Sequence, residues 1–264
     1  MLDLINLRKA FNKKTVNEKV ALNGVNLHLN EGDFVTMIGG NGAGKSTTLN
    51  AIAGTWYLDD GQIILDGNDI TRKTEPQRAL LLGRVFQDPM TGTAASMQIE
   101  ENLALAARRG QRRTLRAGIT NGERQYYRVH LARLGLGLED RMTTKVGLLS
   151  GGQRQALTLL MATLKKPKLL LLDEHTAALD PRTASKVLTL TNEIVQENHL
   201  TTMMVTHNMR DAITYGNRLI MMHEGRIILD ISGEEKKNLT VEMLLEQFAK
   251  ASGDEFTNDR ALLS

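Results

Sequence analysis

The fold is decided by the stretch Phe34-Val35-Thr36-Met37-Ile38-Gly39-Gly40-Asn41-Gly42-Ala43-Gly44-Lys45-Ser46-Thr47. Its first five residues predict a buried strand, and Ser46 to Ala53 predicts a helix that Gly54 can terminate. The segment between them fits the phosphate-loop pattern G-x-x-x-x-G-K-[ST]. An accidental match is expected in roughly one or two chains of this length in a hundred. The flanking strand and helix make that alternative rarer still.

In a phosphate loop, glycines let successive backbone N–H groups turn inward around a polyphosphate, and the following helix presents its positive end to it. Lys45 is then predicted to reach the β and γ phosphates of a nucleotide, and Ser46 to ligate Mg²⁺. The residues expected to contact the nucleotide here are Gly39, Asn41, Gly42, Ala43, Gly44, Lys45, Ser46 and Thr47.

Length and composition limit the function classes. A chain of 264 residues is long enough for one large α/β domain, or for a core with an inserted subdomain. Its 33 basic and 30 acidic residues nearly cancel, so we expect no nucleic-acid partner. With no cysteine, disulfides and thiolate catalysis are excluded. The first residues lack a signal-peptide pattern, and the longest apolar run is far short of the ~20 residues of a membrane helix.

The layout along the chain predicts alternating strands and helices around a helical insertion. Two early strands, 4–7 and 20–29, suggest a small antiparallel β piece. Helical spacing indicates an insertion over 97–164. A crossover helix is predicted over 181–198, with Asp180 as its cap, and a last helix over 240–250 precedes a flexible tail, 251–264. Continuous apolar runs typical of parallel strands covered on both faces occur at 169–172, 202–205, 219–222 and 227–231.

Two further segments have residue types suited to phosphate chemistry. Asp173 and Glu174 end an apolar strand, and neighbouring strand side chains point to opposite faces, so we expect them to have different roles. The alternative is a pair of solvated acids. Ser150 and Gln153 form a capping-box pattern at the start of a helix. Because Gly151 and Gly152 allow close approach there, this is a second helix N-terminus suited to phosphate.

The sequence L-S-G-G-Q at Leu149 to Gln153, together with the phosphate loop, resembles the signature of the ATP-binding cassette, or ABC, family of ATPases. Further matches in family order are Gln87 (Q-loop), the D-loop ending at Asp180 and His207 (H-loop). Departures are Gly40 and His175, where the family often has proline. Without this context, Gln87 would be interpreted as an ordinary turn residue.

The resemblance implies a P-loop NTPase (RecA-like) α/β core with an N-terminal antiparallel β subdomain and an inserted helical signature subdomain. A single domain, 1–250, would consist of a core, 1–96 and 165–250, and the insertion, 97–164. Asp173 and Gln87 would help hold Mg²⁺, Glu174 would be the general base, and His207 would bond the γ-phosphate. Phe11 would stack on adenine beside Val20, although Phe11 could equally be a core residue at a strand end.

The family's partners are implied as well. Two cassettes pack head to tail, so Ser150, Gly151, Gly152 and Gln153 of one chain complete the ATP site of a second, in a homodimer. Transmembrane permease subunits and an extracytoplasmic substrate-binding protein would complete an importer, with this chain peripheral at the cytoplasmic face of the membrane. The segments Asp60-Gly61-Gln62-Ile63 and Ile99-Glu100-Glu101-Asn102-Leu103 are similar to amino-acid importer cassettes. An exporter cassette or a non-transport ABC ATPase is the alternative.

An arginine cluster precedes the second half of the insertion, and it consists of Arg108, Arg109, Arg112, Arg113 and Arg116. We favour a solvated face for it. The alternative is contact with anionic lipid headgroups or with acidic loops of a partner.

Overall fold

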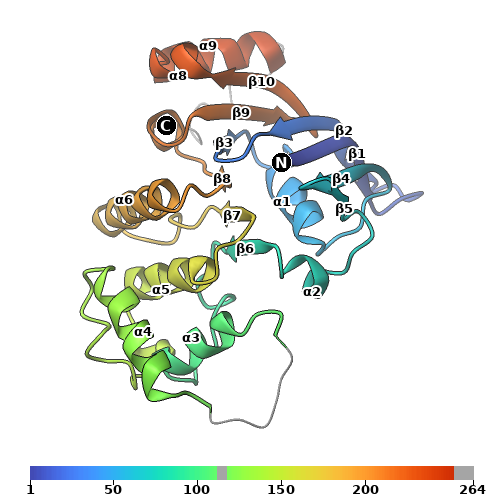
Figure 1. The fold of residues 1–264 in the computed structure, drawn as a ribbon. Helices are drawn as coiled ribbons and strands as arrows, with labels where there is room; N and C mark the ends of the chain where they lie inside the picture. Colours follow the sequence, from blue (N-terminus) through green and yellow to red (C-terminus); the bar gives the residue numbers. More distant parts are fainter. Residues whose placement is uncertain (112–117, 253–264) are drawn as a thin grey trace. The chain divides into compact units, whose positions relative to one another are not determined.

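A computed structural model describes residues 1–111 and 118–252 (Figure 1). The chain divides into two compact units, Met1–Arg78 with His199–Ser264, and Ala79–Asn198. The helical insertion expected over 97–164 falls inside the second unit, and its bounds as a subdomain stay a prediction. No helix in the described ranges is both long and apolar enough to span a membrane.

The first unit contains the predicted antiparallel β piece. Its sheet has the order β2-β1-β4-β5, formed by β1 (Leu2–Phe11), β2 (Lys19–Leu29), β4 (Asp60–Leu65) and β5 (Asn68–Asp69). The strand predicted over 4–7 is longer, because β1 pairs with β2 on one side and with β4 on the other. Both neighbours satisfy its backbone groups, so pairing continues beyond the apolar run.

The phosphate-loop strand, β3 (Phe34–Ile38), lies between β8 (Thr202–Val205) and β9 (Arg218–His223) and is parallel to both. All five residues of β3 are buried, as its continuous apolarity predicts. The parallel direction expected for 227–231 is wrong. That segment, β10 (Arg226–Ser232), pairs antiparallel with β9, because Glu224 and Gly225 have φ of 46° and 74° and make a tight hairpin turn.

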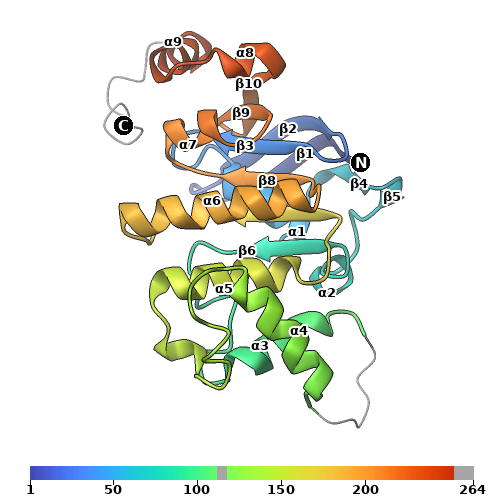
Figure 2. The ribbon, with the colours of Figure 1, turned by 60° about the vertical axis from the view of Figure 1, so that its left-hand side comes forward.

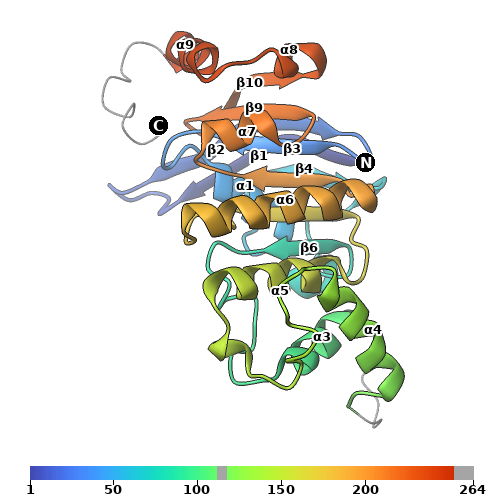
Figure 3. The ribbon, with the colours of Figure 1, turned by 90° about the vertical axis from the view of Figure 1, so that its left-hand side faces the viewer.

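Helices complete the first unit. The loop after β3 leads into α1 (Lys45–Ala53), which Gly54 ends in a left-handed conformation as predicted. The short α2 (Glu75–Arg78) and α7 (Met209–Thr214) follow β5 and β8. Figure 3 shows α8 (Gly233–Lys237) and α9 (Val241–Ser252) beside β10. The predicted last helix is therefore confirmed, while residues 253–264 of the expected tail lie outside the described residues.

The second unit combines two parallel strands with the predicted helices (Figure 2). β6 (Leu82–Val85) pairs in parallel with β7 (Leu169–Asp173). Around them are α3 (Ile99–Ala107), α4 (Asn121–Ala132), a 3₁₀ turn (Val146–Leu148), α5 (Gly151–Thr163) and α6 (Pro181–Glu197). The spacing of apolar residues over 97–164 is explained by one buried cluster that α3, α4 and α5 share.

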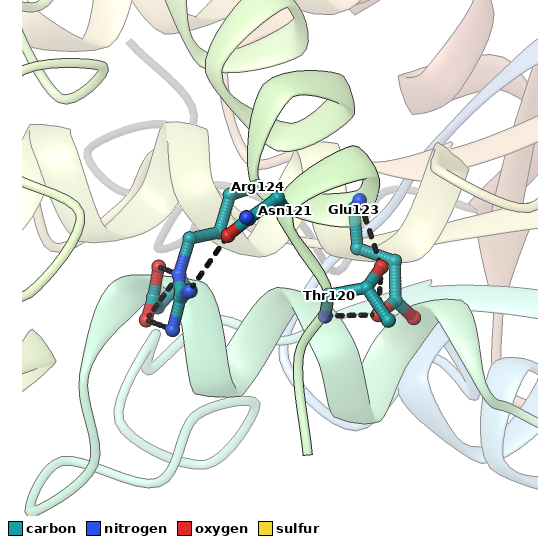
Figure 4. Close-up of polar contacts among 5 residues, drawn as sticks. Thr120, Asn121, Glu123 and Arg124 are labelled. Carbon is teal, nitrogen blue, oxygen red and sulfur yellow. Dashed lines mark hydrogen bonds and ion pairs between the residues drawn. The ribbon is translucent and has the colours of Figure 1, made fainter. Parts of the chain in front are cut away.

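Polar contacts fix the start of α4, as Figure 4 shows. Thr120 and Glu123 form a reciprocal capping box. Arg124 forms an ion pair with Glu100 of α3, with Nε 3.0 Å from Oε2, and the Glu100 side chain is only 7% exposed. A second pair joins Arg108 and Glu123 at 2.8 Å. Two ion pairs therefore connect α3 with α4.

The solvated face expected for the arginine cluster is wrong for Arg109. Its guanidinium donates to the carbonyl of Lys165 at 3.0 Å, and burial lowers its pKa. Arg108 is partly exposed and paired with Glu123. Arg112, Arg113 and Arg116 lie outside the described residues.

Candidate active site

The phosphate loop has the backbone that its glycines permit. Gly39 has a φ of 145°, and a Cβ there would lie 2.2 Å from the carbonyl oxygen of Met222. Gly44 has a φ of 107°, and a Cβ would lie 2.6 Å from the carbonyl oxygen of Ala21. Any larger residue would collide with backbone at both positions. The loop is therefore closely packed between neighbouring segments of the first unit.

Lys45 and the start of α1 have the character of an anion site. Lys45 is 5% exposed, and its Nζ donates to the carbonyls of Gly39 at 2.8 Å and Gly40 at 3.2 Å. Gly44, the residue before α1, provides no side-chain cap, and the first turn of the helix contains no acid. The start of α1 thus lies next to a buried ammonium group, and a helix N-terminus of this kind favours a negatively charged ligand.

A cavity of about 450 Å³ opens beside this loop. Its walls include Val20, which is 51% exposed, as well as Asn41, Gly42 and Ala43 of the phosphate loop. Sequence reasoning missed four other lining residues, which are Lys19, Asn23, His223 and Glu224. Lys19 places a second ammonium group beside the phosphate loop. Its Nζ is so close to Gly42 that a Cβ on this glycine would lie 2.7 Å from it. These residues come from β2, the phosphate loop and the end of β9 with the turn after it, three segments that meet only in the folded chain.

Phe11, the residue expected to stack on adenine, ends β1 and is partly exposed. The edge of the only tryptophan, Trp56, packs against it, with ring centroids 4.8 Å apart and planes at 77°. The Lys9 ammonium lies 5.5 Å from the Phe11 ring centroid. Phe11 is therefore part of an exposed aromatic pair at the strand end. No sequence motif includes Trp56, which follows α1.

His207 follows β8 by two residues and lies in the loop before α7. This loop is tied to the phosphate-loop strand, because the N–H of Thr206 donates to the carbonyl of Met37 at 3.1 Å. Asn208 then caps α7 by accepting from the N–H of Asp211 at 3.1 Å. His207 is thus held between two fixed points, and the first unit places its loop against the strand that leads to Gly39.

In the second unit, β7 ends at Asp173, so the expectation that two carboxylates share the strand is wrong. Glu174 is already in a left-handed turn with a φ of 47°. This conformation is uncommon for a residue other than glycine, asparagine or aspartate, and such strain is typical of functional sites. Asp173 is therefore the last strand residue, and Glu174 lies in the turn that follows it.

Gln87 is exposed two residues after β6. The segment before it is anchored, because the side-chain amide of Gln155 donates to the carbonyl of Phe86 at 3.3 Å. Gln155 is fully buried in α5, the helix that begins at the signature. The second unit therefore links the root of the Q-loop to the signature helix.

The signature pentad has the predicted cap. The Ser150 hydroxyl accepts from the N–H of Gln153 at 3.3 Å, and the Gln153 side chain accepts from the N–H of Ser150 at 3.2 Å. Gly151 is exposed, whereas Gly152 is buried, and a Cβ on it would lie 2.2 Å from Cγ2 of Thr183. Gly152 is thus needed for close packing on α6. Its backbone, at the start of α5, is the part suited to a phosphate.

The D-loop is fixed at both ends. Asp180 caps α6 by accepting from the N–H of Thr183 at 3.1 Å, and hydrogen bonds from Thr183 lower the pKa of the Asp180 carboxyl. His175, which departs from the family pattern, is a packing residue. It is 2% exposed, burial lowers its pKa to about 4, and its Nε2 lies 3.1 Å from Oγ1 of Thr191. Since the Thr191 hydroxyl donates to Val187, the imidazole is the donor to Thr191.

The donor chemistry fits Mg²⁺. Proteins hold this ion through one or two oxygen ligands, together with phosphates and water. Ser46 supplies a hydroxyl at the start of α1, Gln87 an amide, and Asp173 a carboxylate that is 15% exposed. Each is a hard oxygen donor of the kind that Mg²⁺ prefers, one from the first unit and two from the second.

Comparison with known proteins gives the same class. The ABC transporter family model matches residues 22–177. A tyrosine transport ATP-binding protein of Clostridioides difficile (strain R20291) is 45% identical over 95% of this chain and 100% of its own length. A spermidine/putrescine import ATP-binding protein of Haemophilus ducreyi (strain 35000HP / ATCC 700724) is 34% identical over 91% of this chain, which spans 62% of that relative.

Solved structures agree. A dimeric ATP-binding cassette in a post-hydrolysis state, bound to ADP and Pi, superimposes with a TM-score of 0.75 and 28% identity, covering 88% of this chain and 98% of that one. The ADP conformation of another ABC transporter cassette gives a TM-score of 0.76, again with 28% identity, over 94% of this chain and 98% of that one. The class is therefore a P-loop NTPase cassette. This chain belongs to the ABC transporter family, as an ATP-binding subunit and an ATPase.

Proposed function

We propose that this ATPase subunit powers an importer for an amino acid, with tyrosine as the first candidate cargo. The main support is the relative named for tyrosine transport. It is 45% identical over 95% of this chain and 100% of its own length. Relatives named for spermidine/putrescine import and for bicarbonate transport are less similar, at 34%. An exporter cassette or a non-transport ATPase is the alternative, and no relative named here favours it.

The phosphate loop carries the ATP chemistry. Lys45 exchanges its carbonyl partners for the β and γ phosphates, while the backbone N–H groups from Gly39 to Thr47 surround them. Phe11 and Val20 flank the adenine. Ser46, Gln87 and Asp173 hold Mg²⁺, which when bound neutralises charge on the β and γ phosphates.

Hydrolysis then needs an oriented water. Glu174 accepts a proton from the water that attacks the γ-phosphorus, and Gln87 orients this water. His207 donates to a γ-phosphate oxygen and so detects whether the phosphate is present. Glu174 lies in a left-handed turn directly after Asp173, the last residue of β7.

A second copy of the chain completes each site. Ser150, Gly151, Gly152 and Gln153 offer a capped helix N-terminus to the γ-phosphate held by the partner, and Asp180 lies on the loop that crosses the dimer. Closure on ATP and opening after hydrolysis would drive transmembrane permease subunits. A substrate-binding protein would deliver the amino acid, and this chain would act peripherally at the cytoplasmic face of the membrane.

Uptake measurements test the import proposal. Cells lacking their own high-affinity tyrosine uptake would express this chain with its permease, and uptake of radiolabelled tyrosine, spermidine and bicarbonate would be compared. We expect tyrosine uptake with the wild-type chain and none with Lys45→Ala, which should also lose ATP binding in purified form. Uptake of another solute, or tyrosine release in place of uptake, would contradict the proposal.

A further inference from the structure

Arg84 lies beside the carboxylate proposed to hold Mg²⁺. It is located on β6, opposite Leu171 of β7, two residues before Asp173. Its Nη2 lies 3.8 Å from Oδ2 of Asp173, and the two side chains are 13% and 15% exposed. Arg84 belongs to none of the sequence motifs described above.

The guanidinium also contacts an aromatic ring. Its central carbon lies 4.5 Å from the centre of the Phe86 ring, in a cation–π contact. The Phe86 carbonyl accepts from the buried Gln155 of the signature helix. Arg84 therefore contacts both Asp173 and Phe86, the residue before Gln87.

A carboxylate with little solvent access requires a nearby positive charge. At 3.8 Å the contact with Arg84 is too long for a hydrogen bond, so it acts mainly through charge. The same charge repels an incoming divalent cation at short range. We propose that the positive charge of Arg84 stabilises the Asp173 carboxylate in the metal-free protein, and that Mg²⁺ binds to Asp173 despite repulsion from this charge. Arg84 is then a positioning residue that sets the Mg²⁺ concentration at which the ATPase works. This inference rests on the proposed role of Asp173 as a metal ligand.

The test is divalent-ion binding without turnover. Purified wild type, Arg84→Met and Arg84→Lys would be saturated with the non-hydrolysable analogue AMPPNP, and free Mn²⁺ would be followed by electron paramagnetic resonance. We expect Arg84→Met to bind Mn²⁺ about threefold to tenfold more tightly, because the repulsive charge is gone. Arg84→Lys keeps the charge and should stay within about twofold of wild type.

Stability gives a second readout. In EDTA, Arg84→Met should melt at a lower temperature than wild type, and Mn²⁺ with AMPPNP should restore more of the melting temperature than in wild type. If Arg84→Met binds Mn²⁺ no more tightly than wild type, or if Arg84→Lys behaves like Arg84→Met, the proposal is overturned. Should Arg84→Met fail to fold, Arg84→Gln takes its place under the same criteria.

A control separates this inference from the proposed site. Asp173→Asn should weaken Mn²⁺ binding at least about tenfold. If it binds Mn²⁺ as wild type does, Asp173 is not the metal ligand and the proposed site fails. If Asp173→Asn loses Mn²⁺ while Arg84→Met is unchanged, only the role of Arg84 fails.

Discussion

The proposed role of Glu174 as general base can be tested directly by substitution. Its backbone is left-handed, a conformation that glycine adopts more easily, and we propose that its carboxylate is the base. Glu174→Gln keeps the size of the side chain but cannot accept a proton. We expect the rate of Mg²⁺-dependent phosphate release to fall by about 10²–10⁴-fold. ATP affinity should stay near that of wild type, and a variant that hydrolyses at the wild-type rate would remove Glu174 as the base.

Lys236 predicts a pH dependence of stability outside the ATP site. It is 3% exposed, its Nζ donates to the carbonyls of Tyr215 and Gly216, and burial lowers its pKa from 10.5 to about 8. Between these pH values the unfolded chain holds a proton that the folded chain has lost. The free energy of unfolding of wild type should therefore rise with pH from about 8 to 10.5, relative to Lys236→Met.

The full extent of that change is ~3 kcal/mol at 1.36 kcal/mol for each pKa unit. Urea unfolding of both proteins at several pH values measures it. Because other groups titrate equally in the two proteins, the difference isolates Lys236. A difference that stays constant across this range would show that the lysine keeps its ordinary pKa.

At the scale of elements, α3 and α4 are joined by two ion pairs with different burial. Glu100 is nearly inaccessible, so Arg124→Ala leaves a buried carboxylate without this partner. We expect Arg124→Ala to lower the free energy of unfolding by about 1–3 kcal/mol. Arg108→Ala is the matched control, because its pair with Glu123 is partly exposed on both sides and should cost below about 1 kcal/mol. Equal losses in thermal or urea melts would contradict this ranking.

Most elements could be predicted because their signals are local. β8 begins and ends at the predicted residues, and Asp180, Ser150 and Gly54 cap their helices as expected. The direction of β10 could not be predicted from its apolar run, because the Glu224-Gly225 turn is what makes the pairing with β9 antiparallel. The strand predicted over 4–7 is shorter than β1, because pairing with β2 and β4 extends β1 beyond its apolar residues.

The candidate site divides in the same way. Phosphate-loop, signature and D-loop residues stand in contiguous motifs, so their local roles can be inferred from the chain. Lys19 and His223 line the cavity beside the loop only because β2 and the β9–β10 turn meet it there. Arg84 is next to Asp173 because β6 and β7 pair in parallel, which no single segment reveals.

At the scale of the whole molecule, the chain has two helix N-termini suited to phosphate. α1 begins at the phosphate loop of the first unit, and α5 begins at the signature of the second. In the dimer that we propose, one γ-phosphate lies between α1 of one chain and α5 of the other. Bound ATP then stabilises the dimer through contacts with both chains. Slow hydrolysis should therefore lengthen the lifetime of the dimer.

We therefore expect Glu174→Gln to elute as a dimer of the 29.3 kDa chain when ATP is present and as a monomer without it. Size-exclusion chromatography with light scattering measures the mass. Gly151→Glu, combined with Glu174→Gln, is the sharpest control. Position 151 is exposed and an acid at the start of α5 suits the helix, yet its charge repels the partner's γ-phosphate. The double variant should bind ATP and stay monomeric, whereas a Glu174→Gln protein that is monomeric at high concentration with ATP bound would rule out the shared site.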